Sequence, residues 1–442
     1  MTLARFWIPV PSRCKSLFLW RSLPCLPLCA LVFLTFGCGG TPSPPSGNGG
    51  APTAPAVTPG IHPLTQVAAT GSTGYFVDPL PIHLALASGS YIPPIAGTTH
   101  EVLSCTTLAA ECYSPSSLTI TTGPALSSQL PTNTTLNGYQ NNNIYQDNTG
   151  KWQMATTVSV KNLSANPNGL PWNVILHASP VDGGSTSPEG VPLSWISDAL
   201  LIGSFAAQED ANYDGKYIED NSNLYLIYSK RLFDGATAHD GIVAQAMNSA
   251  QQVGGSAPIT LLGPENNADN GYKSERFNCS SNTDQFKLIE TGNITVVNGK
   301  YAMAYSTGSY ETPCYKVGIA WSDSLLGTYK KILKQDASNI WQNPMAEPEV
   351  LYLIQAQQSA WPNYVNSTVQ GPGVPSLVQY PDGTWYLYFA GYDSSVPLNA
   401  GMFDPKLRQP YFMRLSVTIP ANATVAGTAN TDLAEWISAA SQ

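Results

Sequence analysis

Residues 214–229, DGKYIEDNSNLYLIYS, are the stretch that decides the fold, because they form the pattern of a β-hairpin. A short strand leads into a polar turn, and a strongly aromatic strand follows, as in two antiparallel strands joined by turn residues. Three more segments repeat this order. They are residues 141–157 (NNNIYQDNTGKWQMATT), 290–306 (ETGNITVVNGKYAMAYS) and 374–390 (VPSLVQYPDGTWYLYFA).

The four hairpins recur at intervals that fit a module of about four strands. Their aromatic marks, Trp152, Tyr225, Tyr301 and Trp385, lie 73, 76 and 84 residues apart. Three marks are followed by a further strand of small and apolar residues, with the sequences PWNVILHAS, DGIVAQAMNS and YKVGIAWSDSLLGTY. Repeated modules of this size are typical of β-propellers.

The length of the repeating region predicts five blades. Residues 61–442 hold about five modules of this size, and we expect residues 61–136 to supply the fifth blade together with the C-terminal strand PYFMRLSVTI, which closes the ring. The predicted fold class is therefore all-β, a five-bladed β-propeller. A large β-sandwich with accidental periodicity is the alternative.

The composition agrees with a β fold and excludes one class of partner. Only 11% of the residues are charged, beside 37 Gly and 36 Pro, which disfavours helical bundles. The segment before Cys38 holds four basic residues and no acid, so the rest carries 16 Lys and Arg against 29 Asp and Glu. We expect no nucleic-acid partner, because the phosphate backbone requires a basic face.

The N-terminus has the layout of an export signal. A basic stretch ends at Arg21, and the apolar run LPCLPLCALVFLTFG leads to Cys38. The end of this run resembles a bacterial lipoprotein signal in which Cys38 carries the lipid; an ordinary signal peptide is the alternative. Residues 39–60 are a tether rich in Pro, Gly and Ser. We expect a signal (1–38), a linker (39–60) and a propeller domain (61–442), exported to the bacterial envelope or beyond, with the lipid as its only membrane contact.

Four cysteines remain in the predicted domain. An even number in an exported protein favours disulfides. Proximity in the sequence favours the pairs Cys105 with Cys112 and Cys279 with Cys314. A metal site is the competing interpretation, but no CxxC, HxH or HExxH spacing occurs. We expect neither a metal nor a cofactor.

The repeat also predicts where a functional site lies. In a propeller, the leading residues of the innermost strands converge at one end of the central funnel. Counting eleven residues back from each aromatic mark gives Asn141, Asp214, Glu290 and Val374. Two of these four residues are carboxylates, so they are the candidate site.

At these residues the chain resembles glycoside hydrolase family 43, a group of arabinanases, arabinofuranosidases and xylosidases with five-bladed propellers. The third segment, with YKVGIAWSDSLLGTYKK after it, is similar to the family's general-acid blade, which implies that Glu290 is the acid. The second segment is similar to the blade whose Asp tunes and orients that acid, which implies this role for Asp214. The fourth, GPGVPSLVQYPDGTWYLYF, resembles the blade that normally begins Gly-His. The resemblance runs from Gly138 to the end of the chain.

Two positions depart from the family pattern, and both affect the predicted chemistry. Hydrolysis requires an acid to protonate the leaving oxygen and a second carboxylate on the other side of the sugar. Asn141 stands where the base Asp is expected, and an amide cannot take a proton from water; Val374 stands in place of the His. Three explanations are open. Asp78 in FVDPLP could act as the base in place of Asn141, or the register of the first hairpin could be wrong, although its nearest acid, Asp147, falls at the turn. Alternatively, the protein binds a glycan without cleaving it.

Sugar binding also requires flat aromatic surfaces, and Trp361 in the loop SAWPNYVNS is the preferred candidate. Together with Asn141 and Val374 it completes the predicted substrate-binding set. The sequence therefore predicts a glycoside hydrolase acting on plant or microbial polysaccharide of the arabinan or xylan type. The alternatives are a carbohydrate-binding surface lipoprotein without activity and a scaffold for another envelope protein.

Overall fold

The computed structural model describes thirteen stretches of the chain. They are residues 60–63, 78–82, 95–96, 101–104, 114–166, 171–208, 211–234, 237–264, 275, 286–332, 352–355, 368–380 and 383–440. All belong to one unit, Thr53–Gln442. The predicted signal with Cys38, the linker up to residue 59, Trp361, Cys105, Cys112 and Cys279 lie outside the described residues. Within the described part, no helix is long and apolar enough to cross a membrane.

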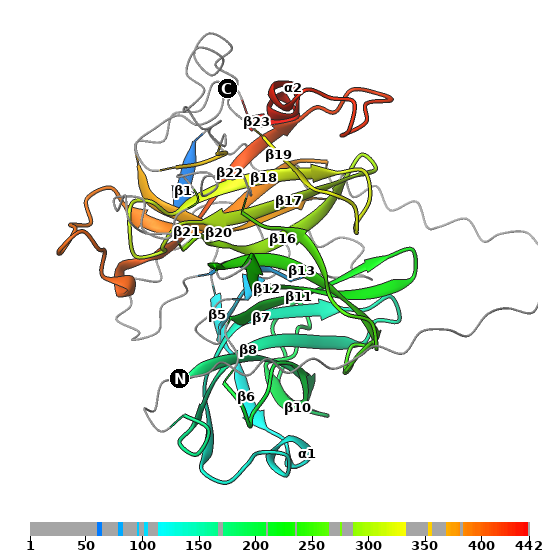
Figure 1. Ribbon diagram of the computed structural model, residues 1–442, viewed down its shortest axis with the longest axis vertical. Helices are drawn as coiled ribbons and strands as arrows, with labels where there is room; N and C mark the ends of the chain where they lie inside the picture. Colours follow the sequence, from blue (N-terminus) through cyan, green and yellow to red (C-terminus); the bar gives the residue numbers. More distant parts are fainter. Residues whose placement is uncertain are drawn as a thin grey trace, which may run out of the picture. The chain divides into compact units, whose positions relative to one another are not determined.

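The described residues form five sheets and only short helices (Figure 1). The first sheet has β2 (Leu80–Pro81), β3 (Ile95–Ala96), β4 (Glu101–Ser104) and β5 (Ser114–Ser117), and the second has β7 (Thr134–Gln146), β8 (Trp152–Asn162), β9 (Trp172–Pro180) and β10 (Ser194–Ile202) with β6 (Thr119–Thr122). The third has β11 (Asn212–Asp220), β12 (Asn223–Asp234) and β13 (Thr237–Ser249) with β14 (Gln252–Val253) and β15 (Ile259–Leu262).

The last two sheets contain the other predicted hairpins. The fourth has β16 (Ile289–Val297), β17 (Lys300–Thr307), β18 (Lys316–Ser322) and β19 (Lys330–Lys331), and the fifth has β20 (Val369–Gln379), β21 (Trp385–Asp393) and β22 (Gln409–Val417) with β1 (Ile61–Pro63) and β23 (Ile437–Ala439). The helices of the described part are α1 (Pro124–Ser127), α2 (Asn430–Glu435) and the 3₁₀ turn η3 (Pro405–Leu407).

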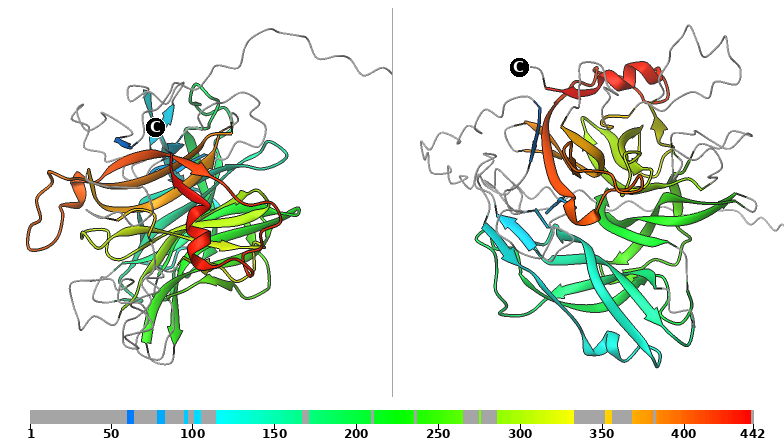
Figure 2. Two further views of the ribbon diagram at one scale, coloured as in Figure 1. Left: turned by 90° about the horizontal axis from the view of Figure 1, so that it is seen from above. Right: turned by 90° about the vertical axis from the view of Figure 1, so that its left-hand side faces the viewer.

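The innermost strands of the five sheets contact one another in a closed ring. β2 contacts β7, β7 contacts β11, β11 contacts β16, β16 contacts β20, and β20 returns to β2. Figure 2 shows the second sheet, drawn from cyan to blue-green, beside the third, drawn in green. Each sheet is thus one blade, and the predicted five-bladed propeller is confirmed. The β-sandwich alternative is set aside.

The prediction for the closing blade was partly wrong. The C-terminal strand β22 pairs with β21 in the fifth sheet, whereas strands β2 to β5 form a sheet of their own. In the described part of residues 61–136, only β1 joins that sheet, where it pairs with β22, with Ile61 opposite Met413 and His62 opposite Phe412. Strands β20, β21 and β22 follow one another along the chain and pair antiparallel in that order. The open edge of β22 then receives β1, so the two ends of the domain meet in one sheet.

The core lies between neighbouring sheets. Successive residues of a strand point to opposite faces of its sheet, so a strand in a middle sheet contributes side chains to the interfaces with both neighbouring sheets. On β12, buried Leu226 packs toward the second sheet with Ile175, while buried Ile227 packs toward the fourth with Met303. Burying each such side chain stabilises the fold by about 1.5–3 kcal/mol. This alternation explains why the aromatic strands of the hairpins read as nearly continuous apolar runs.

Each innermost strand of the four hairpins carries a β-bulge. The residue at positive φ is Asn141 (52°), Asp214 (59°), Thr291 (57°) or Val374 (52°). Non-glycine residues at positive φ, β-branched ones above all, are uncommon and cluster at functional sites. Three of these positions are those that the eleven-residue count predicts.

The fourth sheet corrects that count by one residue. Glu290 still pairs with Ser306, and the register shift comes after it, so Thr291 is the residue equivalent to Asp214. The turn of this hairpin holds only Asn298 and Gly299 between the paired residues Val297 and Lys300. The hairpin of Asp214 also has a two-residue turn, so turn length does not separate the two. Tyr225 lies in the third pair from its turn and Tyr301 in the second, so the aromatic mark itself is displaced by one residue.

Candidate active site

A recurring hydrogen bond fixes three bulges against the preceding blade. The backbone N–H of Asp214 donates to Thr157 Oγ1 at 2.9 Å. The N–H of Thr291 donates in the same way to Ser229 Oγ at 3.1 Å, and that of Val374 to Ser306 Oγ at 2.7 Å. Each hydroxyl comes from the second strand of the blade before. The three bulges are therefore held at one level of the ring, as the convergence of these positions requires.

Glu290 is buried, 9% exposed, and is held by two tyrosines. Tyr315 donates its hydroxyl to Oε1 at 2.6 Å, and Tyr213 donates to Oε2 at 2.9 Å. Burial raises the pKa of Glu290 to about 7, against the two tyrosine hydrogen bonds, which favour the ionised form; the nearby charge of Asp240 raises it further. A carboxyl group with this pKa holds its proton near neutral pH.

Asp214 follows Tyr213 directly, so the residue that binds Glu290 also precedes the second carboxylate. Asp214 is 3% exposed, and its Oδ1 has no hydrogen-bond partner within the described residues. Burial raises its pKa to about 8; Lys216 opposes the shift, and the charges of Glu290 and Asp78 add to it. Like charges close together resist joint ionisation, so these groups share one electrostatic environment.

A third carboxylate, Asp78, belongs to the same cluster. It lies two residues before β2, is buried, and accepts a hydrogen bond from Arg408 Nη1 at 2.8 Å. Burial raises its pKa, while the positive charges of Arg408 and then Lys216 oppose that rise. Asn141 sits at the bulge of a different blade. Asp78 therefore gives the site a third carboxylate even though residue 141 is an amide. A third buried carboxylate in this cluster is what the hypothesis of Asp78 as a substitute base requires.

Arg408 is a site residue that the sequence did not reveal. It follows η3 and lies over the rings of Tyr315 and Tyr310, with its Cζ 5.4 and 5.7 Å from the ring centres. Its Nε and Nη2 are buried and have no partner within the described residues. Buried donors are costly when unsatisfied, so such groups in a polar cluster call for a hydrogen-bonding ligand. A single Arg in a loop carries no sequence signal for this role.

Val374 contributes an apolar wall. It packs with Leu80 and with Tyr315, the residue that binds Glu290. The polar group expected at this bulge is thus replaced by a contact that positions a tyrosine. Asn141 keeps a buried Oδ1 without a partner in the described part of the chain.

Lys216 is the second buried cation of the cluster. It is 5% exposed and lies two residues after Asp214 on β11. Its Nζ donates to the carbonyl oxygens of Gly292 at 3.1 Å and Thr291 at 3.3 Å. Burial lowers its pKa, and the charges of Asp214, Asp78 and Glu290 oppose that fall. Three carboxylates and two cations therefore form one buried polar cluster, and β11 supplies both Asp214 and Lys216.

Comparison with known proteins bears on the fold. No protein-family model matches the sequence, and a search of curated proteins finds no significant match. Among solved structures, a thermostable family-43 glycoside hydrolase is similar over 80% of this chain and 93% of its own, with 17% identity and a TM-score of 0.50. An α-L-arabinofuranosidase from Lactobacillus brevis is similar over 80% and 94%, with 15% identity and a TM-score of 0.52. The chain has a family-43-like fold.

The family-43-like fold confirms the resemblance on which the sequence prediction was based, at the level of architecture. Asp214 and Glu290 do lie in one buried cluster, and Val374 borders it. Trp361 lies outside the described residues and remains a prediction. Cys314 forms a disulfide, but the other three cysteines also lie outside, so both predicted pairings remain predictions.

The members of the cluster that the eleven-residue count does not give have a physical reason in common. Asp78 precedes a strand of two residues, so no aromatic hairpin marks its position, and only the Asp-Pro step in FVDPLP pointed to it. Lys216 lies inside the hairpin segment 214–229, but from sequence a lysine in a strand is expected to be solvent-exposed. The charges of such residues become informative only when the ring brings the blades together.

Proposed function

We propose that the protein is a glycoside hydrolase that cleaves polysaccharide of the arabinan or xylan type by acid–base catalysis. The observation that supports it is the meeting of three buried carboxylates from three blades, in which Asp214 feels the charge of both Glu290 and Asp78. In this proposal Glu290 is the acid, Asp78 is the base and Asp214 positions and tunes the acid.

The environment of each carboxylate suits its proposed role. Glu290 has its pKa raised to about 7, so it is protonated and can give its proton to the glycosidic oxygen as the bond breaks. Burial raises the pKa of Asp78, and its pairing with Arg408 opposes that rise and favours the ionised form, which takes a proton from the attacking water. The sugar lies between these groups, and the unpaired donors of Arg408 are available to its hydroxyls.

The proposal includes the location predicted for the chain. Export and a lipid on Cys38 would hold the propeller at the bacterial surface, where residues 39–60 give it reach to polymer. Expression of the whole chain in a bacterial host tests this part. We expect the protein in the membrane fraction, and Cys38→Ser in the soluble fraction.

Hydrolysis of aryl α-L-arabinofuranosides, aryl β-D-xylosides and arabinan tests the activity. We expect turnover that falls at least 10³-fold in Glu290→Gln and in Asp78→Asn. Glu435→Gln, an exposed carboxylate on α2, is the matched control and keeps full activity. Absence of turnover on all three substrate classes, or turnover unchanged in Glu290→Gln, contradicts the proposal.

A second function has one observation in its favour. Asn141 and Val374 replace the carboxylate and the histidine that the family resemblance implies at these bulges, as expected of a protein that captures glycans without cleaving them. In that case wild-type protein and Glu290→Gln bind arabinan or xylan oligosaccharides equally, and neither releases reducing ends.

A further inference from the structure

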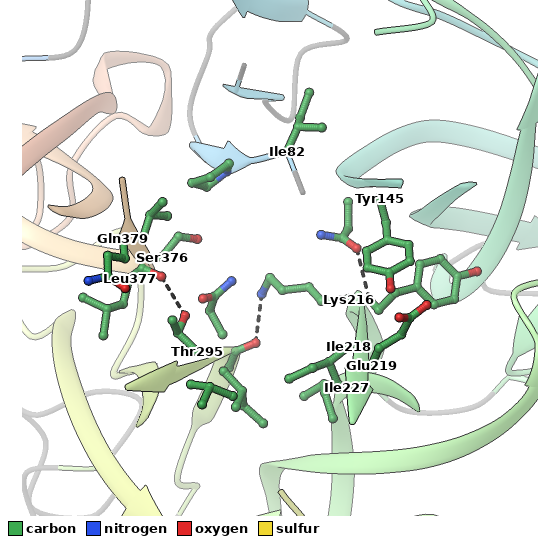
Figure 3. Close-up of a pocket in the computed structure, with 18 of the residues that line it drawn as sticks. Ile82, Tyr145, Lys216, Ile218, Glu219, Ile227, Thr295, Ser376, Leu377 and Gln379 are labelled. Carbon is green, nitrogen blue, oxygen red and sulfur yellow. Dashed lines mark hydrogen bonds between the residues drawn. The ribbon is translucent and has the colours of Figure 1, made fainter. Parts of the chain in front are cut away.

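A cavity of about 650 Å³ lies along the parts of the innermost strands that follow the bulges (Figure 3). Four blades contribute segments to its wall, and Pro81 and Ile82 contribute from the first. Its volume is in the range of small-molecule sites. None of its lining residues is among the three carboxylates of the candidate active site.

A cation marks the inner part of this cavity. Figure 3 shows the side chain of Lys216 extending into it, with Nζ near the backbone of β16. An ammonium group has three protons, and the carbonyls of Thr291 and Gly292 take two. Among the described residues, Lys216 forms no ion pair with a carboxylate within 4.0 Å. One donor of a buried cation thus remains for a ligand.

A second unsatisfied group faces Lys216 across the cavity. Ser376, on β20, is fully buried, and its Oγ has no hydrogen-bond partner within the described part of the chain. In Figure 3 it lies on the side opposite Lys216. Asn143 also lines the cavity, and its Oδ1 accepts from the N–H of Tyr217 at 3.0 Å; within the described residues its Nδ2 has no acceptor. Donors predominate in the inner part.

The remaining wall gives the ligand an orientation. Ile218, Ile294 and Leu377 supply apolar surface for an organic body. Glu219 and Gln379, less buried than Lys216, supply polar groups near the opening. A negative charge near Glu219 is repelled, whereas hydroxyl groups can donate to its carboxylate. A carboxylate is therefore favoured at Lys216 and hydroxyls toward Glu219.

We propose that this cavity binds a small hydroxylated carboxylic acid of the sugar-acid type, with its carboxylate on Lys216 and Ser376. The ligand pairs the buried ammonium and satisfies the unpartnered hydroxyl, and its hydroxyls reach Glu219 and Gln379. Binding does not depend on hydrolysis, because none of the proposed catalytic carboxylates lines the cavity.

Calorimetric titration of the whole protein with D-glucuronate tests the proposal, and D-glucose is the neutral counterpart. We expect saturable binding of glucuronate and at least tenfold weaker binding of glucose. Lys216→Met should weaken glucuronate binding at least tenfold, and Lys216→Arg should restore most of it. Ser376→Ala, which removes a hydroxyl without a partner and so leaves the fold intact, should weaken binding several-fold.

Further variants separate this site from the candidate active site. Glu290→Gln should bind glucuronate as the wild type does, even though its hydrolytic activity is lost, so failure of one proposal is distinguishable from failure of the other. Absence of glucuronate binding to the wild type, equal binding of glucose, or unchanged binding in Ser376→Ala and Lys216→Met overturns the proposal. Binding that survives in Lys216→Met but is lost in Arg408→Lys places the acid at the carboxylate cluster and also overturns it.

Discussion

Tyr213 donates its hydroxyl to Glu290 Oε2 at 2.9 Å, although the two residues belong to adjacent blades. The same hydroxyl lies 3.2 Å from Asp240 Oδ2, and the other oxygen of this carboxylate, Oδ1, is paired with Arg231. Because Tyr213 precedes Asp214, one short segment of β11 both supplies a carboxylate and orients its neighbour. The position of the proposed acid therefore depends on the packing of two blades.

Removal of that hydroxyl should shift the pH profile of hydrolysis. The hydrogen bond from Tyr213 favours ionised Glu290, so Tyr213→Phe raises the pKa of the acid above about 7. The protonated acid is the active form, so the basic limb of kcat/KM should move to higher pH, with a lower maximum because the acid is less well oriented. A pH profile of aryl arabinofuranoside hydrolysis measures both effects. Tyr225→Phe, on the neighbouring strand, is the control; an unmoved limb in Tyr213→Phe argues against this role.

Stability should fall as pH rises through neutrality. Glu290 and Asp214 have folded-state pKa values raised to about 7 and about 8, so the folded protein binds more protons than the unfolded chain between about pH 4 and pH 8. The stabilisation from these groups is present at low pH and is lost toward pH 8; for Glu290 it is at most about 3 kcal/mol.

Urea unfolding at pH 5 and pH 8 measures this dependence. The free energy of unfolding should be larger at pH 5, and Glu290→Gln should reduce the difference, because a glutamine does not titrate. Glu435→Gln should leave it unchanged. A wild type that is more stable at pH 8 than at pH 5 would contradict the burial of protonated carboxyl groups in this cluster.

The hairpins could be predicted from sequence because their information is local. Turn residues and aromatic strands lie within about seventeen positions of one another, as in residues 290–306. The cluster was harder to predict, because its members meet only through the ring. Arg408 pairs with Asp78 across 330 residues, and neither belongs to a hairpin. The register of Glu290 failed by one residue because Tyr301 lies one pair nearer its turn than Tyr225 does, so the aromatic marks are not fully equivalent.

Arg408 should be important for stability as well as for activity. Without it, Asp78 remains buried and unpaired, and breaking a buried pair in this way costs about 3–5 kcal/mol. Arg408→Met should therefore lower the free energy of urea unfolding by that amount, and Asp78→Asn in the same chain should recover part of the loss. Arg414→Met, an exposed arginine on β22, is the control. Equal stability of Arg408→Met and Arg414→Met would show that the pair contributes nothing.

Ser306 should connect the stability of the ring to the geometry of the site. Its Oγ accepts the N–H of Val374 at 2.7 Å and shares a hydrogen bond of 2.6 Å with Thr291 Oγ1, so one hydroxyl holds the bulges of two blades. Ser306→Ala leaves a buried N–H without a partner, which costs about 1–3 kcal/mol. It also frees Val374, which packs on Tyr315, so the orientation of Glu290 is disturbed.

We expect a lower free energy of unfolding and a fall in kcat larger than any change in KM, since Ser306 is set back from the proposed sugar site. Ser416→Ala, an exposed serine on β22, should change neither quantity, and equal behaviour of the two variants would contradict a role for the bulge hydroxyls in holding the site.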